Sequence, residues 1–448
     1  MSIECDVVVL GLGPGGEHLA TELAKAGLDV VGIDRRLVGG ECPYYGCIPS
    51  KMMIRAADAL AEARRVSDLA GAAEVRPDWS PVATRIRDEA TDDWDDTVAV
   101  ERLQKAGVRF VRGTGALSGV GTVTVGGEEI VARRGVVLNT GTEPGVPPLD
   151  GLADTPYWTN RDIVAMTQMP ARMIVIGGGA IGVELAQACV RFGCEVSVVE
   201  AADRLLPPEE PEAGEIVEKA LAADGVRVRT GARIARVDHT DGVFTVDLGE
   251  ESLTAERLLV AAGRRPNLGD IGLDTVGLDP AARSIDTDER MRAGEKLWAV
   301  GDITGKGAFT HMSMYQADVA VRDILGQDGP WADYRAVSRV TFTDPEVGSV
   351  GMTEAQAREA GLDVRTATTS LAESSRGWIA QAEGVIKLVA DADRGVLVGG
   401  CAVGPSGGEI LSLLVTAVHA EVPIATLRGM HFAYPTFHRA VQTALEMF

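Results

Sequence analysis

The chain has few cysteines, no long apolar run and a shortage of positive charge. Its 448 residues include six cysteines, too few for a disulfide scaffold. No apolar stretch reaches the roughly 18 residues of a membrane-spanning helix, and the N-terminus lacks the basic segment of a signal peptide. Lysine and arginine number 43 against 65 acidic residues, and the net charge of -22 argues against nonspecific binding to nucleic acids or anionic membranes. These absences predict a cytoplasmic protein without nucleic-acid or membrane partners.

A dinucleotide-binding pattern occurs twice, 166 positions apart. Residues 6–34 and 173–200 each read as a strand, a glycine turn, a helix and a strand that leads to an acid. The matching positions are Gly11 and Gly177, Gly13 and Gly179, Gly16 and Gly182, and Asp34 and Glu200. Such glycines allow a tight turn and close approach of a pyrophosphate, and the acid accepts hydrogen bonds from a ribose hydroxyl. The pattern predicts two dinucleotide sites, and two glycine turns without ligands are the alternative.

Two cysteines, Cys42 and Cys47, lie five positions apart just after the first copy. On a straight helix such positions point roughly 140° apart, because each residue turns about 100°. Gly46 and Pro49 interrupt the regularity, so the chain can bend until the sulfurs meet. Beside an electron-carrying cofactor, the two sulfurs can act as a dithiol/disulfide couple. Two ordinary buried thiols are the alternative.

The position of the cysteine pair indicates which cofactor each dinucleotide site binds. Flavin passes electrons to and from thiols whereas nicotinamide moves only hydride, so we expect FAD at the first site and NAD at the second. Glu200 would repel a 2′-phosphate and accept from a free 2′-hydroxyl, which favours NADH over NADPH. Arg204 is close enough in sequence to offer a phosphate contact, which weakens this preference. Two cysteines and six scattered histidines form no ligand cluster, so no metal site is expected.

The remaining sequence predicts further segments. Residues 136–144 resemble residues 258–266 at an offset of 122, and both read as a buried strand followed by a turn that could line a cofactor crevice. These turns contain Gly141 and Gly263. The other expected segments are a helix to residue 65 beyond the cysteine loop, an amphipathic helix over 80–106, short strands over 108–132, and strands alternating with helices after Trp331.

In this order, the motifs resemble the class I pyridine nucleotide–disulfide oxidoreductases, the family of lipoamide dehydrogenase, glutathione reductase and mercuric reductase. The resemblance covers essentially the whole chain. Its motifs are the two glycine turns, Gly39-Gly40-x-Cys42-x4-Cys47-x-Pro49-Ser50-Lys51, Gly263-Arg264-Arg265-Pro266-Asn267, Gly301-Asp302 and Thr343-Asp344-Pro345-Glu346-Val347-Gly348.

The resemblance implies an α/β fold with two Rossmann-like dinucleotide-binding domains and a C-terminal α+β dimerisation domain. The expected segments are 1–147 for the first part of the FAD domain, 148–267 for the NAD domain, 268–332 for the central part of the FAD domain and 333–448 for dimerisation.

The resemblance also implies roles for individual residues. Asp302, after Gly301, would bond the FAD ribityl chain, and Lys51 and Glu184 would pair near the flavin N5 edge. Cys47 would face the flavin, and Cys42 would meet the substrate. A helix N-terminus close by would favour the thiolate. The protein would be a homodimer in which each active site borrows residues from the partner subunit.

The sequence departs from the family near its C-terminal motif. Members of the family usually carry a His before Pro-Thr and a Glu three positions after the Thr, and this pair shuttles protons. Here Tyr434 and Arg439 stand at those positions. A phenol is a poor base at neutral pH, so the usual dyad is missing. His438 and, less favourably, His431 are candidate replacements, and Tyr434 is a candidate hydrogen-bond donor.

The predicted function is electron transfer from NADH through FAD to the Cys42–Cys47 disulfide and then to a small disulfide substrate. Because the usual dyad is missing, a first alternative passes electrons to a quinone, dye or metal ion. A second alternative is a non-catalytic flavoprotein whose thiols sense the redox balance.

Overall fold

Separated stretches of the sequence combine into two structural units. The computed structural model describes residues 3–448. Unit 1 comprises the segments ending at Ser50, Thr84–Gly145 and Arg264–Asp333. Unit 2 comprises Lys51–Ala83, Val146–Gly263 and Tyr334–Phe448. The predicted segment boundaries at 147, 267 and 332 remain predictions.

Unit 1 is built on an eight-stranded sheet whose central strands are parallel. The order β3-β2-β1-β6-β17 is parallel throughout, β16 joins β17 antiparallel, and the β4–β5 hairpin joins β6. The strands are β1 (Ile3–Leu10), β2 (Val30–Asp34), β3 (Arg109–Arg112), β4 (Gly115–Gly119), β5 (Thr122–Val125), β6 (Glu128–Leu138), β16 (Arg292–Gly294) and β17 (Leu297–Ala299). The short strands expected over 108–132 are therefore confirmed.

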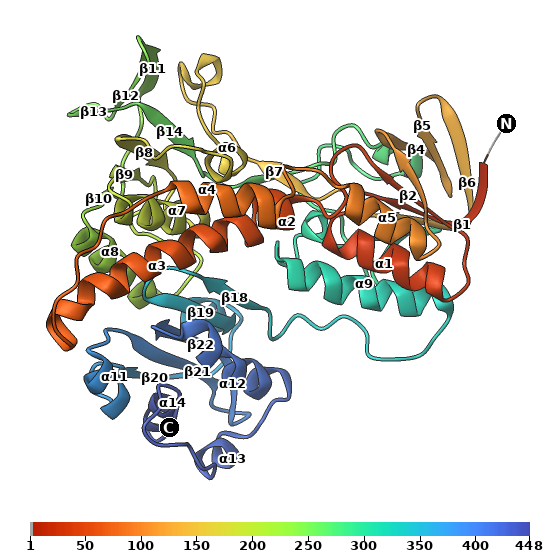
Figure 1. Ribbon diagram of the computed structural model, residues 1–448. Coiled ribbons are helices and arrows are strands. Elements are labelled where there is room, and N and C mark those ends of the chain that lie inside the picture. Colours follow the sequence, from red (N-terminus) through yellow and green to blue (C-terminus); the bar gives the residue numbers. More distant parts are fainter. Residues whose placement is uncertain (1–2) are drawn as a thin grey trace. The chain divides into compact units, whose positions relative to one another are not determined.

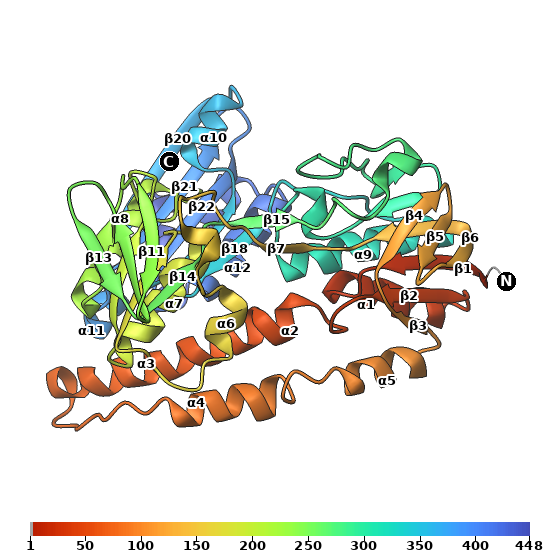
Figure 2. The ribbon, with the colours of Figure 1, turned by 90° about the horizontal axis from the view of Figure 1, so that it is seen from above.

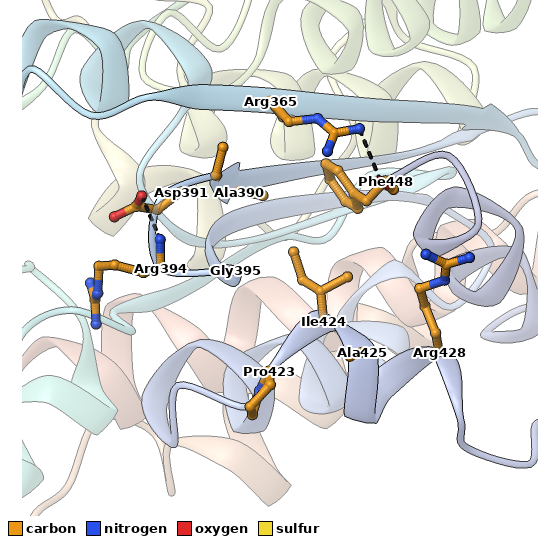
Figure 3. A pocket seen from close by; sticks show the side chains of 11 residues that line it. Arg365, Ala390, Asp391, Arg394, Gly395, Pro423, Ile424, Ala425, Arg428 and Phe448 are labelled. Atoms are coloured by element: carbon orange, nitrogen blue, oxygen red, sulfur yellow. Dashed lines mark hydrogen bonds between the residues drawn. The ribbon is translucent and has the colours of Figure 1, made fainter.

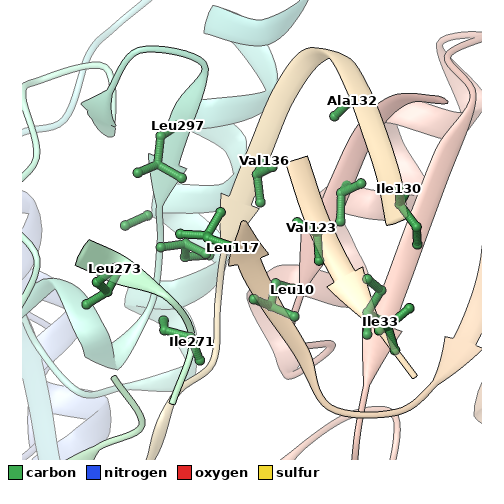
Figure 4. Packing of buried hydrophobic residues seen from close by; sticks show 14 of the residues in the cluster. Leu10, Ile33, Leu117, Val123, Ile130, Ala132, Val136, Ile271, Leu273 and Leu297 are labelled. Atoms are coloured by element: carbon green, nitrogen blue, oxygen red, sulfur yellow. The ribbon is translucent and has the colours of Figure 1, made fainter. Parts of the chain in front are cut away.

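Strand β1 supplies both faces of this core because successive side chains point to opposite sides of a strand. Val7 and Val9 pack with α1 (Pro14–Lys25) and α9 (Thr310–Leu325), which lie side by side in Figures 1 and 2. Leu10 belongs to the opposite face, where the β4–β5 hairpin and the 3-10 helix η3 (Leu273–Val276) contribute side chains (Figure 4).

The cysteine segment folds as two helices separated by a single residue. Helix α2 (Glu41–Tyr45) ends at Gly46, and α3 (Cys47–Leu69) begins immediately after it. The predicted interruption at Gly46 is confirmed. The predicted interruption at Pro49 is wrong, because Pro49 lies in the first turn of α3, where a missing backbone N–H costs no helical hydrogen bond.

The predicted helix over 80–106 is wrong in its middle. Helix α4 (Ser80–Arg85) continues as a π-helical turn, η1 (Ile86–Ala90), and α5 (Thr97–Lys105) begins only after a break. In the break, Asp92, Asp93 and Trp94 all have positive φ angles. Charge patterning alone gave no sign of this interruption.

Unit 2 contains a second parallel sheet in the order β10-β9-β8-β14 and an antiparallel three-stranded sheet, β11-β12-β13. The strands are β8 (Arg172–Ile176), β9 (Glu195–Val199), β10 (Arg227–Arg229), β11 (Arg236–Thr240), β12 (Val243–Asp247), β13 (Ser252–Ala255) and β14 (Arg257–Val260). The accompanying helices are α6 (Asn160–Val164), α7 (Ala180–Arg191) and α8 (Pro211–Asp224).

The C-terminal part of unit 2 is an antiparallel sheet in the order β18-β19-β22-β21-β20. Helices α12 and α14 pack on it around one apolar cluster. The elements are β18 (Ser338–Thr341), β19 (Glu346–Gly351), α10 (Glu354–Glu359), β20 (Val364–Ser370), α11 (Ser375–Ala380), β21 (Val385–Asp391), β22 (Val396–Gly404), α12 (Gly407–His419), α13 (Ile424–Arg428) and α14 (Arg439–Leu445). The expected α+β character of this segment is confirmed.

Candidate functional site

The first glycine turn lies between β1 and α1 and can hold no larger residue. Gly11 has φ +96°, and a Cβ added there would lie 2.3 Å from the carbonyl oxygen of Asn139. A Cβ on Gly16 would lie 2.1 Å from the oxygen of Gly11. Asp34 ends β2, and its carboxylate accepts hydrogen bonds from the backbone of Leu12 (2.7 Å) and Arg36 (2.8 Å). The turn and the acid are therefore fixed together.

The second glycine turn, between β8 and α7, repeats this geometry. Gly177 has φ +113°, and a Cβ there would lie 2.4 Å from the oxygen of Ala261. Glu200 accepts from the backbone of Gly178 and Ala202. These partners lie 166 positions after Leu12 and Arg36, and Ala261 lies 122 positions after Asn139. Both offsets noted in the sequence therefore recur as equivalent contacts.

Both turns fit a dinucleotide pyrophosphate. Gly13 and Gly179 are the N-caps of α1 and α7, and a glycine at this position places no side-chain acceptor over the first N–H groups of its helix. A Cβ on Gly179 would meet nothing within 4 Å, so the turn is open. Free N–H groups at a helix N-terminus are a suitable anion site, and the carboxylates of Asp34 and Glu200 are suitable ribose acceptors.

The fit predicts the effect of an alanine in the second turn. We expect Gly177→Ala to weaken NADH binding by on the order of tenfold or more, because the added methyl group would displace the turn. Gly193→Ala is the matched control, since Gly193 has φ +96° but a Cβ there would meet nothing within 4 Å. Titration of NADH into the two variants measures the effect, and unchanged affinity in Gly177→Ala would contradict the assignment.

The remaining predicted cofactor residues lie in turns. Gly141 and Gly301 have φ +63° and +81°, in unit 1, and Gly263 has φ +108°, in unit 2. The carboxylate of Asp302 accepts from the hydroxyl of Thr142 at 2.6 Å. Strand β7 (Thr142–Pro144) pairs with β15 (Arg264–Pro266), so the expected turn after residue 263 is tied to the turn that contains Gly141.

The structure brings the thiols of Cys42 and Cys47 together. The thiol of Cys42 hydrogen-bonds to that of Cys47 and to Thr310, and Cys47 Sγ lies 3.4 Å from Thr310 Oγ1. Cys47 is exposed and Cys42 is half-buried. The hydrogen bond to Cys47 and, next, burial raise the pKa of Cys42, although Thr310 opposes the shift. The expected preference for the thiolate is therefore not found at Cys42, which needs a proton acceptor before it can attack a substrate.

Lys51 and Glu184 form the predicted ion pair within unit 2. Their Nζ and Oε2 atoms are 2.6 Å apart, and Glu184 is buried. The second carboxylate oxygen of Glu184 accepts from the backbone of Phe342 at 2.7 Å, and the Lys51 ammonium lies 4.6 Å from the centre of the Phe342 ring. The pair is thus held from several sides.

Arg191 is the centre of a buried charge cluster that the sequence analysis missed. Only 4% of its side chain is exposed, and its guanidinium pairs with Asp58 (2.7 Å), Asp224 (2.9 Å) and Asp344 (2.8 Å). Burial raises the pKa of Asp58 to about 6 although Arg191 opposes this shift. Arg191 follows Glu184 by seven positions, so both lie on one face of α7. Polar residues at this spacing in an apolar helix were the available signal.

The C-terminal candidates lie in unit 2, outside regular structure. Tyr434 is 68% exposed, and its hydroxyl donates to Ser375 Oγ at 3.1 Å. His438 precedes α14, and its Nε2 lies 3.5 Å from Thr436 Oγ1. The Arg439 guanidinium lies 5.4 Å from the centre of the Tyr434 ring. This segment therefore contains a phenol, an imidazole and a guanidinium.

A surface pocket of about 370 Å³ lies in the C-terminal part of unit 2 (Figure 3). Arg365 points from β20 toward Phe448 and donates to its oxygen at 3.0 Å, while Ile424 and Arg428 come from α13. None of the candidate redox or cofactor residues lines this pocket. It therefore takes no part in the site assigned above.

Residues 3–448 contain neither a cluster suited to a metal ion nor a helix suited to span a membrane. No group of three His, Cys, Asp or Glu side chains within this range could hold a metal ion. Within the same range, no helix has the length and apolar character needed to cross a bilayer.

Two family profiles together match nearly the whole chain. The profile described as pyridine nucleotide-disulphide oxidoreductase matches residues 5–323, and the dimerisation domain of that family matches residues 337–445. A mercuric reductase from Acidithiobacillus ferrooxidans is 31% identical over 99% of the chain and 83% of its own length. A dihydrolipoyl dehydrogenase from Halobacterium salinarum is 32% identical over 100% of the chain and 96% of its own length.

Solved structures agree with these matches. The HOCl-induced flavoprotein disulfide reductase RclA from Escherichia coli has a TM-score of 0.86 at 26% identity, with 99% of both chains covered. Its Cu(II) complex has a TM-score of 0.85, also at 26% identity and 99% coverage of both chains. LpdA from Mycobacterium tuberculosis has a TM-score of 0.87 at 25% identity, again over 99% of both chains.

Proposed function

Because the chain belongs to the pyridine nucleotide–disulfide oxidoreductase family, whose members are NAD(P)H-dependent flavoenzymes, we propose that it carries electrons from NADH to a small disulfide through Cys42 and Cys47. The observation that carries this proposal is the hydrogen-bonded pair of thiols, with Thr310 bonded to both. Two thiols with only a packing role would not need to lie within hydrogen-bonding distance of each other across a helix break. The pair instead has the proximity that a reversible disulfide needs.

The two glycine turns support binding of two different cofactors. FAD fits the first turn, in the unit that contains both cysteines, and the chemistry that bound FAD supplies is electron transfer between NADH and the disulfide. Gly11, Gly13 and Gly16 would approach its pyrophosphate, and Asp34 would accept from its ribose. Asp302 would bond the ribityl chain. Lys51 follows Cys47 by one turn of α3, which supports the proposed role of the Lys51–Glu184 pair in tuning the flavin.

The second turn supports a preference for NADH over NADPH. Glu200 places a carboxylate where the adenine ribose would lie, and a 2′-phosphate would be repelled there. Arg204 already uses guanidinium donors within its own loop, where they bond to the carbonyl oxygens of Leu206, Pro207 and Glu209. Arg204, which weakened the NADH preference expected from the sequence, is thus bonded to carbonyl groups of its own loop.

The negative charge of Glu200 predicts how kcat/KM for NADH compares with kcat/KM for NADPH. We expect kcat/KM for NADH to exceed that for NADPH by on the order of a hundredfold, since like charges brought together cost several kcal/mol. Glu200→Gln keeps the size of the side chain but removes its charge, so it should narrow the ratio. Steady-state kinetics with both cofactors measure the effect. Equal use of NADH and NADPH by the parent protein would contradict the assignment.

The dithiol can reduce a disulfide in two balanced exchange steps. Cys42, once deprotonated, attacks one substrate sulfur, which forms a mixed disulfide and releases the first product thiolate. Cys47 then attacks the Cys42 sulfur, which restores the intramolecular disulfide and releases the second thiolate. The two cysteine thiols lose two protons and two electrons. The electrons reduce the substrate disulfide, and the two leaving thiolates take up the protons.

The proton on Cys42 must go to a nearby base because the pKa of this thiol is raised. The His/Glu dyad that is usual in the family is replaced here by Tyr434 and Arg439. We assign the proton-accepting role to His438 and a hydrogen-bonding role to Tyr434, whose hydroxyl already donates to Ser375. Residues 337–445 match the family's dimerisation domain, so we place these side chains in a homodimer, at the active site of the partner subunit.

An NADH-coupled screen of disulfides and quinones tests the function. The proposal requires turnover of at least one small disulfide and loss of that turnover on alkylation of the reduced thiols. A second candidate function is favoured by the missing dyad and by the solved Cu(II) complex of RclA, and it directs electrons to a quinone or metal ion instead. Turnover of such acceptors that survives Cys42→Ala would support this second function. Slow turnover with every acceptor would support a redox-sensing role.

A further inference from the structure

The break between α4 and α5 contains an unusual backbone conformation. Asp92, Asp93 and Trp94 follow one another with φ angles of +48°, +53° and +58°. Residues other than glycine and, occasionally, Asn or Asp seldom enter this left-handed region, and they do so singly rather than in runs. Such conformations persist only where the surrounding structure enforces them, and they gather at functional sites.

Local hydrogen bonds hold this turn, which we call the Asp92–Trp94 turn. Thr91 is almost fully buried, and its hydroxyl donates to the carbonyl oxygen of Ile86 at 3.0 Å. The backbone N–H of Asp93 donates to the oxygen of Arg87 at 2.7 Å. These hydrogen bonds connect the Asp92–Trp94 turn to the π-helical turn η1 and fix the position of the Asp92–Trp94 turn.

Trp94, in this turn, and Asp96, two residues later, bond to the backbone on both sides of Cys42. We call the bonded stretch, residues 38–44, the redox segment. The indole N–H of Trp94 donates to the carbonyl oxygen of Tyr44 at 3.2 Å, two residues after Cys42. The buried carboxylate of Asp96 accepts from the backbone of Val38 at 2.6 Å, four residues before Cys42. Arg112 neutralises Asp96 at 2.5 Å.

We propose that Trp94 and Asp96 are positioning residues that hold α2 so that the Cys42 sulfur stays within bonding reach of Cys47. Helix α2 has only five residues and is separated from α3 by Gly46, so its own hydrogen bonds cannot fix its place. The bond to Tyr44, within α2, and the bond to Val38, three positions before its first residue, restrict the movement of Cys42. This restriction raises the effective concentration of one thiol at the other and favours the disulfide.

The inference depends on the proposed redox couple and has its own measurement. The reduced holoenzyme is equilibrated with oxidised and reduced glutathione. Formation of the Cys42–Cys47 disulfide consumes one glutathione disulfide and releases two glutathione thiols. Alkylation and mass spectrometry then give the equilibrium constant for this exchange. This equilibrium constant depends on the geometry of the two thiols. A variant that only lowers the free energy of unfolding should leave it unchanged.

We expect Trp94→Phe to lower this equilibrium constant about three- to tenfold, the effect of one lost hydrogen bond. Trp79→Phe is the matched control, because the indole of Trp79 also donates to a backbone oxygen, that of Met166 at 2.9 Å, outside the redox segment. The control should keep the parental constant. A parental constant in Trp94→Phe would overturn the inference.

A second variant keeps the test decisive if Trp94→Phe does not fold. Asp96→Asn keeps the size of the side chain but weakens the bond to Val38 and the ion pair with Arg112, so we expect a shift in the same direction. An unchanged constant in a folded Asp96→Asn protein would also overturn the inference. If the parent protein forms no Cys42–Cys47 disulfide at any glutathione ratio, the proposed function itself fails, which is a separate result.

Discussion

Replacement of Cys42 or Cys47 by serine is expected to lower turnover of the disulfide substrate by about a thousandfold or more, because a serine hydroxyl cannot exchange with a disulfide. The two sulfurs form one hydrogen-bonded unit, so either substitution alone should remove nearly the whole activity. NADH-coupled assays with the best disulfide from the screen measure the loss.

The two variants should differ in their spectra. Cys47 is the exposed thiol and is assigned to the cofactor side, so Cys42→Ser should keep a thiolate–flavin charge-transfer band that Cys47→Ser lacks. Cys401→Ser is the control, because Cys401 is buried next to Ser349 Oγ at 3.5 Å and a serine can keep that contact. Full disulfide turnover in Cys47→Ser would exclude the proposed function.

Removal of the Arg191 side chain is expected to produce the largest loss of stability. Arg191→Met would leave Asp58, Asp224 and Asp344 around a buried position without the guanidinium that joins all three, and Arg65 would remain paired with Asp344. Loss of one partner from a buried ionic cluster costs about 3–5 kcal/mol of unfolding free energy. Urea unfolding of the holoenzyme, followed by circular dichroism, measures the change.

An exposed arginine provides the comparison for Arg191. Arg227 pairs with Glu195, and both side chains are about half exposed. Arg227→Met should therefore cost at most about 1 kcal/mol, as is usual for surface ion pairs. Equal stability of the two variants would show that the Arg191 cluster contributes no more than a surface pair.

The sequence was sufficient for those features that depend on local geometry. The glycine turns were predictable because Gly11 and Gly177 need a left-handed backbone and a close approach that no other residue allows. The break at Gly46 followed from the same reasoning. Pro49 was misjudged because its position relative to the start of α3 was unknown, and proline is harmless in a first turn.

Features that depend on long-range contacts were not predictable. The expected helix over 80–106 fails where Asp96 and Trp94 bond to residues 58 and 50 positions earlier in the chain. The Arg191 cluster joins carboxylates from three segments far apart in the sequence, so no local pattern identifies its members. The raised pKa of Cys42 likewise depends on how the thiol is buried and on its bond to Cys47.

The central claim is that Cys42 and Cys47 form a redox couple that exchanges electrons with the flavin. Anaerobic titration of the oxidised holoenzyme with NADH tests it most directly. The first equivalent should make two thiols per chain available to a thiol reagent and produce long-wavelength charge-transfer absorption, while the flavin stays oxidised. Complete bleaching of the flavin by that first equivalent, with no gain in thiols, would contradict the claim.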